Sequence, residues 1–249
     1  MSITEMVEQH KMETINIRYL FKLPDNRREI IDLHLDPHTL DLMNEIPEQP
    51  PSWTKLDFYK CPHCLLSIQD HPHCPVAVHL MKVLAICTNL FSYETIHVEI
   101  ITNERTVSKE TSAQKGISSL MGLIMATSGC PHTNFLKPMA RFHLPLASIE
   151  ETVCRAVSMY LLAQYFLRKQ GKKADFDLEG LKKIYSNIKL INVAMAERLR
   201  TIIDEDAAVN ALTILDNFAH ALPLVIEESL EDTRYLFAPY LDQTDRADD

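Results

Sequence analysis

Three cysteines that lie close together place the strongest constraint on how this chain folds. Cys61 and Cys64 flank a Pro-His pair, and Cys74 follows ten residues later within His-Pro-His-Cys-Pro. Two cysteines separated by two residues can point at one centre, and a third at this distance can close the same loop. The spacing therefore predicts a loop organised around a tetrahedral metal site.

The fourth ligand of such a site has to come from another segment. We favour Cys130, which lies in Ser-Gly-Cys-Pro-His just past a predicted helix end, where Gly129 frees the backbone to present a thiolate. His73 and His132 are the alternatives for this position. A ligand from this segment would join the two parts of the chain. The predicted metal ligands are Cys61, Cys64, Cys74 and Cys130.

Three kinds of chemistry suit these cysteines. Ligation by four thiolates, or by three thiolates and a histidine, favours zinc. An iron–sulfur cluster is the alternative cofactor, because Cys61, Cys74 and Cys130 are each followed by proline, as in ferredoxin-type loops. The Cys-Pro-His-Cys tetrapeptide also resembles the active site of thioredoxin-fold disulfide oxidoreductases. Against that resemblance, Pro72 and Pro75 would stop the helix that has to carry the motif.

The first part of the chain predicts an antiparallel sheet. Residues 14–24 and 28–36 alternate as a β-hairpin, and 93–102 with 105–109 form a second pair of strands. Residues 75–91 open with proline and carry an apolar face, which predicts a helix. This part is a small α+β unit that contains one helix and the loop of cysteines and histidines.

The second part predicts an all-helical bundle. Helices are expected over residues 111–127, 148–169, 178–203, 204–220 and 224–237. Thr111 and Gln114 have the spacing of a capping box, and Pro223 is expected to separate the last two helices. The predicted fold is α+β, a small N-terminal antiparallel β unit followed by an all-α helical bundle. Its predicted parts are residues 1–110, 111–241 and a disordered acidic tail, 242–249.

Charge and glycine content exclude several classes of protein. The formal net charge of −9 disfavours nucleic-acid binding, because phosphate binding needs a cationic surface. The chain has only five glycines and contains neither common nucleotide-binding fingerprint nor the Gly-x-Ser-x-Gly elbow of hydrolases. No apolar run approaches the roughly 20 residues that span a bilayer, and residues 1–13 lack the apolar run of a secretory signal. We therefore expect a cytoplasmic protein with reduced thiols.

A second candidate site follows Cys130. Residues 137–145 combine two prolines with Lys137, Arg141 and His143, which predicts a loop that binds a small anion or a protein partner. The cations would hold charge, and His143 would exchange protons near neutral pH. A rigid connector with its cations in water is the alternative. The predicted ligand or partner loop comprises His132, Lys137, Arg141 and His143.

Three stretches of the chain carry a family resemblance: INIRYLF…LHLDPHTLDLM, CPHC…HCPVA and SGCPHTNFLKPMARFHLP. They resemble an uncharacterised bacterial protein family with an N-terminal domain of unknown function. The resemblance implies a bacterial cytoplasmic protein, and it carries no activity, cofactor or catalytic residue.

The sequence as a whole favours a non-enzymatic metal-binding protein. Its zinc would be structural, and the loop after Cys130 would bind a small anionic ligand or an unknown protein. The alternative is a thiol or iron–sulfur redox enzyme that uses the Cys-Pro-His-Cys motif and Cys130. An exposed apolar helix face would equally suit a core or a homo-oligomer interface.

Overall fold

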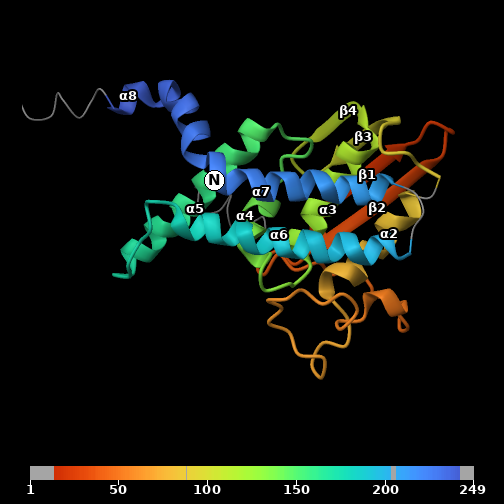
Figure 1. Cartoon of the computed structure of the whole chain (residues 1–249). Helices are drawn as coiled ribbons and strands as arrows, with labels where there is room; N and C mark the ends of the chain where they lie inside the picture. Colours follow the sequence, from red (N-terminus) through yellow and green to blue (C-terminus); the bar gives the residue numbers. More distant parts are fainter. Residues whose placement is uncertain (1–13, 88, 203–205, 242–249) are drawn as a thin grey trace, which may run out of the picture.

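The computed structural model describes residues 14–87, 89–202 and 206–241, and it shows a mixed architecture of one sheet and several helices (Figure 1). The four antiparallel strands have the order β2-β1-β3-β4. Their bounds are Ile15–Lys22 for β1, Arg28–Leu35 for β2, Thr95–Ile101 for β3 and Thr106–Ser112 for β4. All four predicted strands are confirmed. Buried side chains alternate along β1, β2 and β3, whereas the edge strand β4 has only exposed and half-buried side chains.

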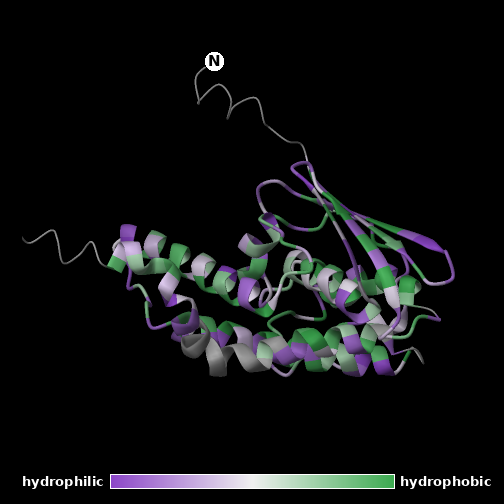
Figure 2. Cartoon of the chain, turned by 90° about the horizontal axis from the view of Figure 1, so that it is seen from above, coloured by the Kyte–Doolittle hydropathy of each residue, from purple (hydrophilic) through white to green (hydrophobic). Residues whose placement is uncertain are grey.

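The sheet forms one layer, and two successive layers of helices cover one of its faces (Figure 2). The first layer holds α2, Pro75–Cys87, and α3, Ala113–Thr127, and α3 contacts β3 and β4. The second holds the long helices α6, Glu179–Arg200, and α7, Ala207–Thr233, which lie side by side. Helix α5, Ile149–Lys169, contacts α7.

The remaining elements are short. They are η1, Ser52–Thr54; η2, Asn134–Leu136; α4, Lys137–Arg141; η3, Arg234–Phe237; and α8, Ala238–Leu241. Among the described helices, none is both long and apolar enough to cross a lipid bilayer. The predicted acidic tail, residues 242–249, lies outside the described residues.

One hydrophobic cluster joins the sheet to the helices. It contains Tyr19 and Phe21 of β1, Leu80 of α2, Leu120 of α3 and Met195 of α6. The predicted division near residue 110 falls at the turn from β4 into α3, and residues from both sides of it contribute to this cluster. A smaller cluster lies where α5 meets α6.

Glycine sets the spacing between α3 and the sheet. A β-carbon on Gly116 would lie 2.9 Å from both Ile96 Cδ1 and Val98 Cγ2, which is closer than carbon atoms pack. Gly129 follows the C-terminus of α3 with a φ of +84°, as predicted for a glycine that ends a helix. The turn that it makes leads directly to Cys130.

Two details of the helix predictions are wrong. The capping box at Thr111 does not form, because the backbone N–H groups of Ala113 and Gln114 already bond the carbonyls of Glu94 and Ser92. The expected break at Pro223 is also absent, and α7 runs from residue 207 to 233. A proline inside a helix removes one backbone hydrogen bond, and packing of α7 against α3 and α6 outweighs that loss.

Candidate metal centre

Backbone hydrogen bonds fasten the base of the segment that carries the first three cysteines. The Cys74 N–H donates to the Thr54 carbonyl at 2.8 Å, and the Leu56 N–H donates to the Pro72 carbonyl at 2.9 Å. The hydroxyl of Thr54 lies 2.7 Å from Nδ1 of His73. We call residues 54–74 the cysteine loop; it lies beside α2 and α6 at the bottom of Figure 1.

The structure places the four predicted cysteine ligands in or against the large hydrophobic cluster. Cys61 and Cys64 lie in the cysteine loop, where the Cys64 N–H donates to the Cys61 carbonyl at 3.1 Å. Cys74 directly precedes α2, and Cys130 follows the glycine that ends α3. All four are free thiols that belong to the large hydrophobic cluster or pack against its surface. We call Cys61, Cys64, Cys74 and Cys130 the cysteine cluster.

Electrostatic coupling shows that the four sulfurs share one environment. Burial, together with negative charge on Cys74, Cys130 and Cys64, raises the pKa of Cys61 to about 12. Burial also raises the pKa of Cys130, to which Cys74 and Cys64 contribute. Each thiolate therefore disfavours ionisation of the next, and a cation among them would reverse that effect.

The backbone that follows Cys130 favours its thiolate. Hydrogen bonding from the backbone of His132 and Thr133 opposes the rise in the pKa of Cys130 that burial causes. The same turn is closed by N–H groups of Thr133 and Asn134, which donate to the Cys130 carbonyl at 3.1 and 3.2 Å. Donation to the charged form stabilises a thiolate. The turn after α3 is therefore suited to present Cys130 as a ligand.

The donor set fits a thiophilic metal, although the sulfurs would have to move together to bind it. In the part of the chain that the structure describes, no three Cys, His, Asp or Glu side chains are already arranged to hold a metal ion. The cluster nevertheless supplies four soft donors, the number that zinc takes in structural sites. Cys61 and Cys64 lie in a turn outside any helix or strand, where a small adjustment costs little.

The two histidines considered as alternative ligands are engaged elsewhere. The Nε2 atom of His132 lies 2.8 Å from the carbonyl oxygen of His63, and their rings pack with centroids 4.1 Å apart. His73 bonds to the Thr54 hydroxyl through Nδ1. These contacts favour Cys130 over His132 and His73 as the fourth ligand.

Arg198 completes the surroundings of the cysteine cluster, and the sequence prediction did not include it. From α6 its guanidinium donates to the carbonyls of Trp53 and Lys55 at 2.8 Å and of Leu56 at 3.2 Å. Only 1% of the residue is exposed. One sequence signal could have identified Arg198. Met195 follows Ile191 by four residues and Arg198 follows Met195 by three, which puts Arg198 on the buried face of α6.

The predicted ligand loop is not a loop, and its cations do not converge. Residues 137–141 form α4, with Pro138 in the first turn, where proline is well tolerated. Lys137 Nζ pairs with Asp41 Oδ1 at 2.5 Å, and the guanidinium of Arg141 lies over the ring of Phe142. Because each cation has its own neighbour, the two do not form a shared anion site.

His143 is half-buried, and its imidazole is hydrogen-bonded to the buried Tyr19. Its Nε2 atom lies 2.6 Å from the hydroxyl of Tyr19, which is also 3.1 Å from the hydroxyl of Ser119. Burial, together with the charge of Arg155, lowers the pKa of His143 to about 3. This environment does not favour the expected proton exchange, and the bond to Tyr19 anchors the segment after α4 to β1.

Replacing His143 with glutamine is expected to reduce the dependence of stability on pH. The folded pKa of about 3 lies below the unfolded value of about 6.5, so unfolded chains bind the proton first as the pH falls. The stabilisation is complete above pH 6.5 and is lost toward pH 3. Between pH 7 and 5, wild type should lose about 2 kcal/mol more than the variant in urea unfolding. Replacement of the exposed His38 by glutamine is the control, and equal losses in all three proteins would contradict the assignment.

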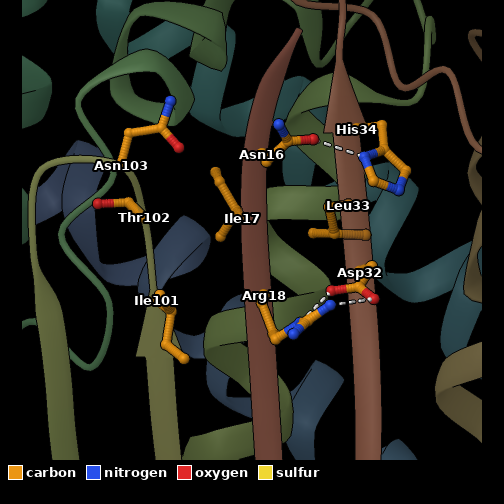
Figure 3. Close-up of a pocket in the computed structure, with 9 residues that line it drawn as sticks. All are labelled: Asn16, Ile17, Arg18, Asp32, Leu33, His34, Ile101, Thr102 and Asn103. Carbon is orange, nitrogen blue, oxygen red and sulfur yellow. Dashed lines mark hydrogen bonds and ion pairs between the residues drawn. The ribbon is translucent and has the colours of Figure 1, made fainter.

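A shallow hollow on the open face of the sheet is a weaker candidate site. Figure 3 shows its polar side chains paired with one another across β1 and β2. Arg18 binds both carboxylate oxygens of Asp32, at 2.6 and 3.0 Å, and Asn16 lies 2.6 Å from Nδ1 of His34. Because these side chains already hydrogen-bond to each other on an exposed surface, few donors or acceptors remain for a ligand.

Comparison with known proteins identifies a family without assigning an activity. The family model described as a domain of unknown function (DUF6901) matches residues 17–238, which is most of the chain. No curated protein and no solved structure is significantly similar to the chain. The match spans the sheet, the cysteine cluster and the long helices, so these features lie within the domain that defines the family.

Proposed function

Because the chain belongs to the DUF6901 family, whose description gives no activity, we propose a function from the geometry of the cysteine cluster. We propose a non-enzymatic protein in which Cys61, Cys64, Cys74 and Cys130 hold a structural zinc ion. The observation that supports the proposal is that four free cysteines from separate segments lie in or against one hydrophobic cluster, where negative charge on Cys74, Cys130 and Cys64 helps to raise the pKa of Cys61. Zinc commonly takes such a set of four thiolates.

The bound ion would add to the contacts, such as that of His63 with His132, that already hold the cysteine loop to the rest of the fold. Cys61 and Cys64 belong to the cysteine loop, Cys74 precedes α2, and Cys130 follows α3. The described backbone bonds fasten the loop only at its base, near Thr54 and Leu56. A metal ion would therefore fix the rest of the loop against the core, which is the usual role of a structural site.

Thiol-disulfide exchange, the alternative function, has less support. An exchange cysteine needs a lowered pKa, which usually comes from its place at a helix N-terminus or from nearby positive charge. Here burial and neighbouring thiolates raise the pKa of Cys61 to about 12, despite the positive charge of Arg198. No helix follows Cys64 directly, because α2 begins only at Pro75. Cys61 is therefore poorly suited to act as a nucleophile.

The metal content of untagged protein, purified without oxygen, tests the proposal. We expect about one zinc per chain and no visible colour, since Zn²⁺ has a filled d shell. If the protein instead contains iron and sulfide and is brown, the same cysteines hold an iron–sulfur cluster and not zinc. Protein without metal that fails to take up added zinc, and that readily forms a Cys61–Cys64 disulfide, would overturn the proposal in favour of thiol exchange.

A further inference from the structure

Arg198 is a buried cation without a carboxylate partner. Among the described residues, no Asp or Glu side chain forms an ion pair with it, whereas the neighbouring Arg200 pairs with Glu197 at 2.7 Å. Its guanidinium donates hydrogen bonds to three backbone carbonyls, and its Nε has no hydrogen-bond partner among the described residues. The guanidinium stays protonated in proteins, so its positive charge has to be balanced within the fold.

The groups that can balance this charge are the thiols of the cysteine cluster. The carbonyls of Trp53, Lys55 and Leu56, which Arg198 binds, belong to the strand-like segment that pairs with residues 72–74. Between these carbonyls, that of Thr54 accepts from the Cys74 N–H at 2.8 Å. Burial lowers the pKa of Arg198, and negative charge on Cys74, Cys61, Cys64 and, least, Asp57 opposes that shift. Phe58 covers the guanidinium at 6.0 Å from its ring centroid. Arg198 therefore faces the cluster from α6 across a short stretch of backbone.

We propose that Arg198 is the counter-charge of the metal–thiolate centre and couples α6 to the state of that centre. This inference rests on the proposed zinc site. Four thiolates around Zn²⁺ leave two excess negative charges, and a partly buried anionic centre is costly without a nearby cation. Groups that surround the ligands of a metal site tune its affinity in this way.

Two substitutions separate the charge of Arg198 from its hydrogen bonds. Arg198→Lys keeps the positive charge and loses the guanidinium fork, whereas Arg198→Gln keeps an N–H₂ donor and loses the charge. Zinc affinity of the full chain is measured by competition with a chromophoric chelator. We expect Arg198→Gln to lower the affinity about 10- to 100-fold, and Arg198→Lys to lower it less than about fivefold. Arg200→Gln, on the exposed side of the same helix, should match wild type.

The pattern of affinities decides between the two roles of Arg198. Equal losses in the lysine and glutamine variants would show that Arg198 acts only by holding the carbonyls, and unchanged affinity in the glutamine variant would show that its charge is irrelevant. Either result overturns the proposal and leaves the zinc site intact. Wild-type protein without zinc affinity would overturn the site itself. If the glutamine variant does not fold, a loss above about 100-fold in the lysine variant would overturn the counter-charge and a small loss would support it.

Discussion

Replacing both Cys61 and Cys64 with serine is expected to abolish zinc binding and to lower the free energy of unfolding by several kcal/mol. The physical reason is that the binding energy of a structural metal is folding energy, because unfolded chains do not hold the ligands together. Serine oxygens are poor substitutes for thiolates toward zinc. Urea unfolding, with zinc content measured on the same samples, gives both quantities.

Chelation provides the matching test on unaltered protein. Wild type treated with a strong chelator should fall to the stability of the Cys61→Ser/Cys64→Ser variant, and the chelator should leave that variant unchanged. Cys154→Ser is the control, because Cys154 is exposed on α5 away from the cysteine cluster, and it should stay within about 0.5 kcal/mol of wild type. A double variant as stable as wild type would identify Cys61 and Cys64 as ordinary half-buried cysteines.

Gly116→Val should destabilise the protein by about 3 kcal/mol through overpacking. Even the β-carbon of the new side chain would lie 2.9 Å from Ile96 Cδ1 and Val98 Cγ2, and 3.7 Å from Phe21 Cε1. These neighbours are buried in the main cluster, so none can move aside freely. Helix α3 would have to shift away from the sheet. Thermal or urea unfolding measures the loss.

Gly122 offers a control for Gly116 within the same helix. Among the described residues, a β-carbon there would meet Leu215 Cδ2 alone, at the ordinary contact distance of 3.5 Å. Gly122→Ala should therefore be neutral or stabilising by up to about 1 kcal/mol, because alanine has the higher helix propensity. If Gly116→Val left stability unchanged, the close approach of α3 to the sheet would be wrong.

The sheet could be predicted from the sequence because its signal is local. β1 buries Ile15, Ile17, Tyr19 and Phe21 in strict alternation, so both its type and its inner face follow from the pattern. The continuity of α7 could not be predicted, because Pro223 is a local stop signal and packing against α3 and α6 overrides it. Similarly, the cap of α3 depends on the carbonyls of Ser92 and Glu94, which the local motif does not include.

Only part of the candidate site was open to prediction. The spacing of Cys61, Cys64 and Cys74 identified three members of the cysteine cluster, and the turn after Gly129 identified Cys130. Arg198 was missed because a cation in phase with apolar residues can equally extend to solvent, and only the packed structure shows which occurs. The partners of Lys137 and His143 could not be predicted for a related reason, since Asp41 and Tyr19 are distant from them in sequence.

The central place of β1 in the sheet affects the kinetics of folding. β1 pairs with its sequence neighbour β2, and it also pairs with β3, as Lys22 does with His97. The hairpin can close early, whereas β3 can join only after the intervening chain, which includes the cysteine loop and α2, has become compact. Any cross-link that shortens this connection reduces the entropy lost when β3 docks. An ion held by Cys61, Cys64 and Cys74 would thus reduce slightly the entropy lost when β3 docks on β1.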